Sequence, residues 1–287
     1  MIYVSLPEKR ARIWGSLPGP DGSTPVGEIW WIHHGEDGAS SSLEGEDGTR
    51  TTVADLVMSG RLPGGRRYPL LLKTLHTADE LSVQVHPGMN GGGLFKEETW
   101  MVLRAVEGAW MMGGMEPVGR KVFMEAMSAG RAGEVLRKIS LRSGDVYHIP
   151  PGTVHALGPG LTVLEIQSNC DVTYRIHDWG RLGLEGKPRK LDLKEAADAM
   201  DWDVPAAPIP VGRNWNIDVD DFARYSIKAV SGKKRVRLPD GAVLFVFRGS
   251  AGIDDEAPVC FIADGDGGEV DVNGRGFVFE PGGNHER

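Results

Sequence analysis

GDVYHIPPGTVHAL, residues 144–157, places two histidines, His148 and His155, on either side of the sequence Pro-Pro-Gly at 150–152. Such a run favours a tight turn, because proline fixes its own φ angle and glycine adopts the conformations that turns require. The flanking segments have the residue pattern of short strands. We therefore predict that the turn re-aims the chain and that His155 projects from the strand that follows.

The composition is that of a globular protein with many turns. The chain has 287 residues, of which 40% are hydrophobic and 25% charged, with 40 glycines and 18 prolines. This length allows one large domain or two modest ones. The net charge of −8 argues against nucleic acid as the main partner, since phosphate backbones are bound by basic surfaces. A small phosphorylated ligand held by a few local Lys and Arg side chains remains compatible with this charge.

The expected location follows from segments that the sequence lacks. The N-terminal segment has no apolar core of a secretory leader, and no run of about 18 apolar residues predicts a membrane-spanning helix. Two cysteines, Cys170 and Cys260, are too few for a disulfide framework, so a reducing compartment is expected. We expect a cytoplasmic protein that does not bind a membrane and has no evident obligate protein partner.

Short strand patterns dominate the chain, and few helices separate them. Residues 81–87 alternate between apolar and polar side chains, and residues 99–106 and 109–115 have the pattern of a β-hairpin. Helices are predicted within 118–139 and over 191–201. A doubly wound parallel sheet would need a helix after each strand, so the pattern favours a mainly β sandwich, jelly roll or barrel.

A proline-punctuated connector at residues 205–212 separates two strand-rich blocks. We predict a first domain over residues 1–204, with an N-terminal segment and a helical insert at about 118–139, and a smaller β domain over residues 213–287. The second block has no histidine before His285 and no cluster of ligand-type residues, so we expect no metal there.

Four side chains form a candidate metal site. Gln84 and His86 are two residues apart in LSVQVHP, so a strand directs both to one face. Glu98 opens the next strand, and His155 follows the turn described above. Two imidazoles, a carboxylate and a carboxamide oxygen suit Zn²⁺, Fe²⁺, Mn²⁺, Co²⁺ or Ni²⁺, and affinity alone does not choose among these ions. Lys96, two residues before Glu98, shares its face if the segment is extended.

These residues carry a resemblance to a known family. GDVYHIPPGTVH fits the second motif of the cupin superfamily, G-x5-P-x-G-x2-H. The segments LSVQVHP, KEETWMVL, HIPPGTVHALGPG and LEIQSNCDVTYRIHDWGR resemble, in the same order, type I mannose-6-phosphate isomerases in their short bacterial and archaeal form. RIWGSLP and GEIWW resemble the N-terminal segments of that family, so the resemblance covers roughly residues 12–181.

The resemblance implies a cupin double-stranded β-helix, or jelly roll, with one zinc ion per chain in its mouth, although other divalent metals fit the same ligands. The C-terminal third of the chain is only consistent with this resemblance, and from its strand pattern we expect the smaller domain over residues 213–287 to be a cupin-like β domain. The family's metal ligands fall on Gln84, His86, Glu98 and His155. Arg175 falls on the arginine regarded as catalytic, and Lys96 falls on a lysine that lines the substrate site, so both are assigned to catalysis.

The implied activity is the interconversion of mannose 6-phosphate and fructose 6-phosphate through an enediol. A divalent metal acts there as Lewis acid, and a nearby guanidinium stabilises the enediolate, which is the role we assign to Arg175. Lys96 contacts the sugar or its phosphate. Glu165, His177 and Asp178 are candidate substrate-binding residues. The base is one of these three or a metal-bound water, and the sequence does not choose among them.

The chain departs from the family pattern in places that bear on sugar specificity. The loop at 88–93 is short and glycine-rich, Met101 stands where a tyrosine is common, and His177 and Trp179 replace tyrosines. The alternatives are another cupin enzyme, either a different sugar-phosphate isomerase or an iron oxygenase, and a non-catalytic sugar-binding protein. The Gln-His-Glu-His set and the arginine segment favour an isomerase over an oxygenase. The intact Lys96 and Arg175 favour an enzyme over a binding protein.

Overall fold

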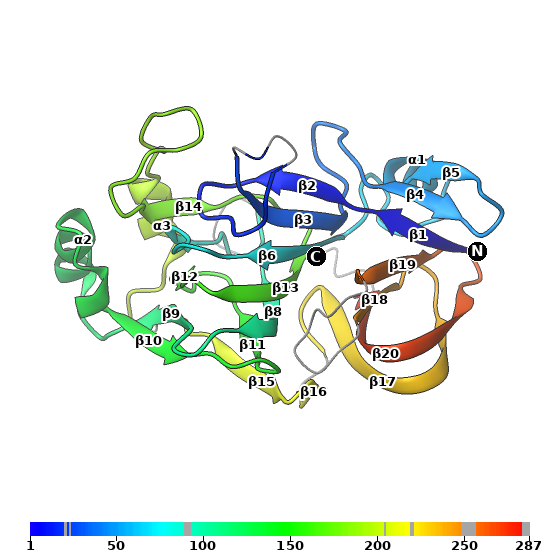
Figure 1. Ribbon diagram of the computed structural model, residues 1–287. Helices are drawn as coiled ribbons and strands as arrows, with labels where there is room; N and C mark the ends of the chain where they lie inside the picture. The colour runs from blue at the N-terminus through cyan, green and yellow to red at the C-terminus, as the bar shows by residue number, and fades with distance from the viewer. Residues whose placement is uncertain are drawn as a thin grey trace.

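The computed structural model describes residues 1–19, 22, 24–88, 93–203, 205–218, 221–247 and 257–282. Over these residues the chain is mainly β, as predicted, and its strands form three antiparallel sheets (Figure 1). The eight-stranded sheet has the order β16 (Asn216–Ile217), β15 (Ile209–Arg213), β11 (Val146–Ile149), β8 (Glu98–Ala105), β13 (Leu161–Ser168), β6 (Leu70–His76), β3 (Val26–Ile32) and β2 (Glu8–Ala11). The five-stranded sheet has the order β10 (Leu136–Ser140), β9 (Trp110–Met115), β12 (His155–Leu157), β7 (Val83–Val85) and β14 (Tyr174–His177). These two sheets form the predicted cupin-type fold.

The eight-stranded sheet is covered on both faces. Every residue of β6 and β13 is buried, which explains why these strands have nearly continuous apolar sequences instead of a polar alternation. On one face Leu75 and Val163 pack with Trp100 in the core that faces the five-stranded sheet. On the other face Leu72 and Leu164 belong to a separate core. Alternate side chains of one strand therefore lie in different compartments.

The five-stranded sheet is covered on its outer side by two helices, α2 (Arg120–Ser128) and α3 (Leu193–Ala199). The described residues also form the 3₁₀ turn η1 (Ala132–Glu134) after α2, and the short helix α1 (Val53–Met58), which packs in the core on the far face of the eight-stranded sheet. Phe123 and Met127 of α2 pack with Val83 and Ile176 of the sheet, and Ala196 of α3 joins the same core. In Figure 1 both helices lie at the end of the molecule away from the N-terminus.

Two local predictions are corrected by the structure. Residues 98–105 and 110–115 are strands, but they do not pair as a hairpin, since β8 lies in the eight-stranded sheet and β9 in the five-stranded sheet. The turn between them carries the chain from one sheet to the other, and the strand pattern alone does not report this. The helical insert predicted at about 118–139 is also too long, because residues 136–139 belong to β10, which pairs with β9.

The seven-stranded sheet combines the two ends of the described chain. Its order is β17 (Tyr225–Leu238), β20 (Gly268–Pro281), β18 (Val243–Phe247), β19 (Val259–Ala263), β1 (Ile2–Leu6), β4 (Ser42–Gly45) and β5 (Arg50–Thr52). β1 pairs with β19, so strand pairing crosses the division predicted between residues 204 and 213. That division stays a prediction. The sheet packs against the eight-stranded sheet through aromatic side chains such as Phe245, which meets the Trp31 ring at 5.2 Å.

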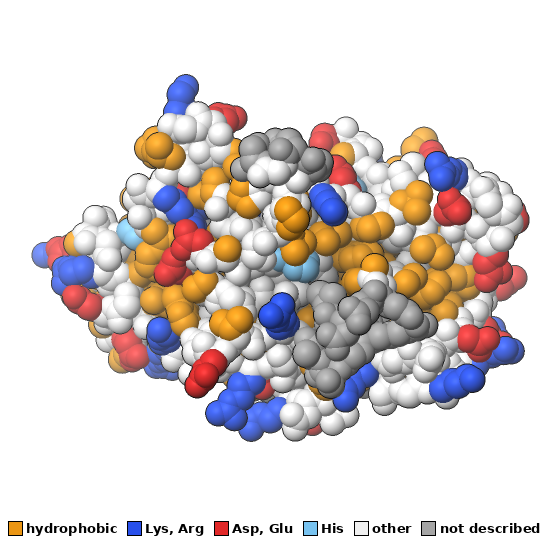
Figure 2. Space-filling view, viewed as in Figure 1, with side chains coloured by type: hydrophobic (Ala, Val, Ile, Leu, Met, Phe, Trp, Pro, Cys, Tyr) orange, Lys and Arg blue, Asp and Glu red, His pale blue; other side chains and the backbone are white. Residues whose placement is uncertain are grey.

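The surface carries charges of both signs around its outline. On the face in Figure 2, apolar side chains gather over β1 and β19, where Val4, Leu6 and Val259 are partly exposed. Among the described residues, no helix is long and apolar enough to span a membrane. The short loop predicted at 88–93 has residues 89–92 outside the described part of the chain.

Candidate metal centre and active site

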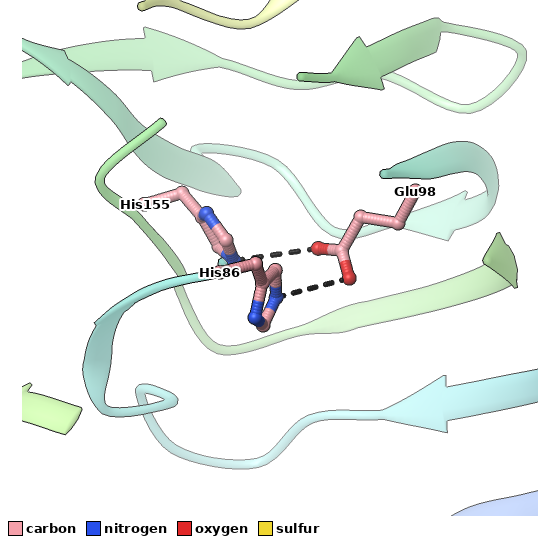
Figure 3. A group of neighbouring side chains, drawn as sticks. All are labelled: His86, Glu98 and His155. Carbon is pink, nitrogen blue, oxygen red and sulfur yellow. Dashed lines mark ion pairs between the residues drawn. The ribbon is translucent and has the colours of Figure 1, made fainter. Parts of the chain in front are cut away.

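Three of the predicted metal ligands meet between the two cupin sheets. His86 follows β7, Glu98 begins β8 and His155 begins β12, and their ligand atoms lie within 4.8 Å of one another (Figure 3). His86 Nε2 is 3.1 Å from Glu98 Oε2, and His155 Nε2 is 3.3 Å from Glu98 Oε1. All three residues are at most 2% exposed. Each carboxylate oxygen therefore faces one of the two neighbouring imidazoles, away from solvent.

Backbone carbonyls orient both imidazole rings. His86 Nδ1 is 3.1 Å from the carbonyl oxygen of Val172, and His155 Nδ1 is 2.9 Å from that of Thr153. A carbonyl only accepts hydrogen bonds, so each ring carries its proton on Nδ1 and keeps a lone pair on Nε2. The predicted turn contributes directly, because the Gly152 N–H donates to the His86 carbonyl at 3.1 Å. The Pro-Pro-Gly turn thus fixes His155 and connects it to His86.

The protonation states of these three groups suit metal binding. Burial, with a smaller contribution from Lys96, lowers the pKa of His86 to about 3, and burial also lowers the pKa of His155. Burial alone would raise the pKa of Glu98, but the pKa lies well below its ordinary value, and the Lys96 ammonium 3.4 Å from Oε2 favours the ionised form. Neutral imidazoles and an ionised carboxylate are the forms that bind metal. His86 Nε2 and Glu98 Oε1 are buried and make no hydrogen bond to the described residues, so the donor set fits a divalent cation.

Gln84 lies beside the three ligands, as predicted. It is the cross-strand partner of His155 between β7 and β12, and its Nε2 is 3.1 Å from His155 Nε2. A half-turn of the carboxamide would exchange its nitrogen and oxygen, so this side chain can present a neutral oxygen to the same place. The predicted quartet is therefore together in space, with both sheets contributing to it.

A cavity of about 650 Å³ opens onto this centre. Its lining includes the predicted residues Gln84, Lys96, Glu98, Glu165 and Arg175. Lys96 is buried, with Nζ 3.4 Å from Glu98 Oε2. Arg175 lies opposite Gln84 on β14, where its guanidinium donates to Ser82 Oγ at 3.3 Å and to the Lys190 carbonyl at 3.1 Å. Positive side chains therefore lie close to the metal centre and on the wall beside it.

A buried network of charges that the sequence analysis missed forms another wall of the cavity. Lys73 Nζ is 3.0 Å from Glu165 Oε1, and Trp100 Nε1 donates to Glu165 Oε2 at 3.0 Å. Glu28 accepts a hydrogen bond from Arg12 at 2.6 Å, and its negative charge contributes to raising the pKa of Lys73. Burial, aided by the charge of Glu98, raises the pKa of Glu165 to about 7 despite Lys73. A lone lysine within the apolar run 68–75 was the sequence signal for this network.

Two predicted substrate residues, His177 and Asp178, are not among the described residues that line the cavity. A register shift between Arg175 and His177 in the pairing of β14 with β7 ends the simple alternation, and the His177 ring packs edge-on against Trp179. Asp178 is buried and accepts hydrogen bonds from Arg181 and from Arg189. Arg189 lines the cavity, so Asp178 holds a cavity-lining side chain in place without lining the cavity itself.

Comparisons with known proteins agree with this geometry. Residues 9–100 match the family model for the catalytic domain of type I phosphomannose isomerase. The chain is 33% identical over 218 residues to mannose-6-phosphate isomerase ManA of Bacillus subtilis, covering 70% of this chain and 68% of that protein. It is 37% identical over 148 residues to mannose-6-phosphate isomerase of Streptococcus mutans, covering 50% of this chain and 47% of that protein.

A solved structure extends the likeness beyond these alignments. The mannose 6-phosphate isomerase of Bacillus subtilis superposes with a TM-score of 0.78 at 26% sequence identity, covering 97% of this chain and 98% of that one. The similarity thus includes the two cupin sheets and also the seven-stranded sheet, which we call the C-terminal sheet because β17, β18, β19 and β20 form most of it. With a curated relative at 33% identity that is covered over more than two thirds of its length, the chain belongs to the type I phosphomannose isomerase family.

Proposed function

We propose that the chain is a metal-dependent aldose–ketose isomerase that interconverts mannose 6-phosphate and fructose 6-phosphate. The observation that carries this proposal is the buried His86–Glu98–His155 cluster, with its unpaired ligand atoms, at a cavity that also contains Lys96 and Arg175. Relatives named for this activity support the choice of substrate.

The metal would be held by His86, Glu98 and His155 together with the amide oxygen of Gln84. We propose zinc, which suits a set of two imidazoles and a carboxylate. When bound, such an ion supplies Lewis-acid polarisation of sugar oxygens. The buried surroundings and the carbonyl contacts of both imidazoles keep the ligand atoms in place before binding.

Moving a proton between C1 and C2 of the sugar needs a base and a group that stabilises the enediolate. Arg175 is permanently charged and lies on the wall next to Gln84, so we assign it the developing oxyanion. Glu165 is our choice for the proton-transfer group, since a pKa of about 7 matches the ideal for a base near neutral pH. Lys73 holds its carboxylate in position.

The phosphate of the substrate needs cationic partners. Lys187, Arg189 and Lys190 line the same cavity, and Asp178 holds Arg189. We propose that these side chains and Lys96 receive the phosphorylated end and the sugar hydroxyls. We also propose a cytoplasmic location, since Cys170 and Cys260 are free thiols.

The test is a coupled assay for conversion of mannose 6-phosphate to fructose 6-phosphate, with the metal content of the same sample measured. We expect turnover that is lost on chelation and restored by Zn²⁺, without a requirement for oxygen. Bound metal with no turnover would exclude this substrate, and turnover that survives complete metal removal would exclude the metal-dependent reaction. Arg175→Ala should lose turnover while keeping the fold and the metal.

A further inference from the structure

The metal ligand Glu98 is the first residue of β8, a position that strand pairing alone holds weakly. Strand ends open more readily than strand centres, because a terminal residue has paired neighbours on one side only. Glu98 has cross-strand partners in Ile149 of β11 and Gln167 of β13, but Glu97 before it belongs to no strand. The placement of the Glu98 carboxylate therefore depends on what holds Glu97.

The backbone of residues 223–224, just before β17, binds the side chain of Glu97. Its side chain is only 3% exposed, and it accepts two backbone hydrogen bonds, from the Arg224 N–H at 2.6 Å and from the Ala223 N–H at 3.3 Å. Hydrogen bonds that a carboxylate accepts are among the strong ones in proteins. The main chain of Glu97 is fixed as well, because it exchanges hydrogen bonds with Ser168 at 3.1 and 3.3 Å.

Thr99, two residues after Glu97 and inside β8, makes a second contact with this segment. Thr99 Oγ1 is 3.0 Å from the Tyr225 hydroxyl and 3.0 Å from His148 Nδ1. The His148 ring in turn stacks on Phe222, with centroids 4.5 Å apart. Glu97 and Thr99 thus face the C-terminal sheet, while Glu98 between them faces the metal centre, as alternation requires.

We propose that Glu97 is a positioning residue, which fixes the metal ligand Glu98 by binding the backbone of residues 223–224 at the start of the C-terminal sheet. The contact of Thr99 with Tyr225 supports the same bracing. This inference rests on the metal site of the proposed function. It gives the C-terminal sheet a part in metal binding, although that sheet supplies no ligand to the described cluster.

The test measures metal affinity separately from stability. Zn²⁺ is titrated into the metal-free chain in competition with a chromogenic chelator, and the Tm of each metal-free protein is recorded. Glu97→Gln keeps the size of the side chain but turns an amide N–H₂ toward one of the two backbone donors. We expect it to weaken Zn²⁺ binding about 10- to 100-fold, as loss of outer support for a ligand does.

The matched control is Asp264→Asn, which also changes a buried carboxylate but does so far from the metal ligands in the fold. Asp264 directly follows β19 of the C-terminal sheet and binds Arg61 at 2.6 Å and the amino group of Met1 at 2.7 Å. We expect this variant to lower the Tm without changing the Zn²⁺ affinity. Equal affinity in Glu97→Gln and the wild type, or equal losses in Glu97→Gln and Asp264→Asn, would overturn the proposal.

Two further outcomes are covered by the same titration. If Glu97→Gln does not fold, Tyr225→Phe is used instead, because it removes only the hydroxyl that contacts Thr99. A smaller loss of Zn²⁺ affinity is then expected. Wild-type Zn²⁺ affinity in Tyr225→Phe would overturn the proposal that this segment positions Glu98. If the wild type itself does not bind Zn²⁺ or another divalent ion, the proposed metal site fails and this inference fails with it. Binding by the wild type with no effect of Glu97→Gln would refute the inference alone.

Discussion

The two faces of the eight-stranded sheet differ in chemistry although the same strands supply both. On the cavity face, Lys73, Glu165 and Trp100 form a buried polar network beside the metal ligands. On the opposite face, Leu72 and Leu164 pack with the aromatic side chains of the C-terminal sheet. Buried charges are tolerated only when paired, and they add little net stability, whereas apolar burial adds much. On β6 and β13, a single residue step therefore leads from the charged network of the cavity, Lys73 and Glu165, to the apolar core on the other face, Leu72 and Leu164.

The largest effect is expected from removing the central metal ligand. Glu98→Ala deletes the carboxylate that faces both His86 and His155, so we expect Zn²⁺ affinity to fall by more than the roughly 10- to 100-fold typical of outer-sphere changes, and turnover to disappear. The measurement is metal content after dialysis, together with the coupled assay. His76→Gln, a substitution of a buried histidine outside the cluster, is the control and should keep its metal. Retained metal in Glu98→Ala would contradict the assignment.

The opposite face is tested by Phe245→Ala. Phe245 is fully buried against Trp31, so its truncation should lower the free energy of unfolding by about 3–5 kcal/mol. Urea unfolding of the metal-free chain measures this loss. The folded fraction should bind Zn²⁺ as the wild type does, because Phe245 touches none of the ligands. A change in metal affinity comparable to that of Glu98→Ala would break the separation of the two faces.

The buried carboxylate of Glu165 should give the stability a recognisable pH dependence. Its pKa rises from an ordinary 4.5 to about 7 in the folded chain, so the folded state holds a proton that the unfolded state releases. Stability from this group is therefore present below pH 4.5 and is lost as the pH rises through about 7. Relative to the wild type, Glu165→Gln should gain on the order of 3 kcal/mol across that window.

The measurement is denaturant unfolding of both metal-free chains at a series of pH values. The comparison of two chains is needed because the buried histidines His86, His76 and His148, whose pKa values are lowered, change stability in the opposite direction over part of the same range. A difference between wild type and Glu165→Gln that stays constant with pH would show that Glu165 does not titrate there.

The smallest effect is expected at the rim of the cavity. Asp178→Asn removes the negative charge that holds Arg189 and Arg181, so we expect the KM for mannose 6-phosphate to rise about fivefold, the equivalent of about 1 kcal/mol, with little change in kcat. Steady-state kinetics with metal content checked gives the answer. A fall in kcat with an unchanged KM would instead place Asp178 in the chemical step.

The sequence predicted those parts of the fold and site that depend on local pattern. Alternation put Gln84 and His86 on one face, and the Pro-Pro-Gly turn indicated that His155 would be re-aimed. The pairing of Lys73 with Glu165 was not predicted, because it depends on which strands are neighbours, and that order is set by long-range packing. His177 is not among the described residues that line the cavity, because a bulge that no sequence pattern revealed ends the alternation after Arg175, and its part in substrate binding stays a prediction.

The joining of β1 to β19 has the same long-range origin as the Lys73–Glu165 pair. Nothing in residues 2–6 or 259–263 alone indicates that they are neighbours, and the apolar side chains of either strand would fit several sheets. The pattern of residues 99–115 predicted both strands correctly, but the predicted hairpin was wrong because the two strands belong to different sheets.

Anomalous diffraction from crystals grown with Zn²⁺ is the decisive test for one divalent metal between the two cupin sheets. We expect a single zinc peak per chain, at about 2.0–2.2 Å from His86 Nε2, His155 Nε2, the Glu98 carboxylate and the Gln84 amide oxygen. A zinc peak bound elsewhere, or no peak at this cluster under saturating Zn²⁺, would contradict it.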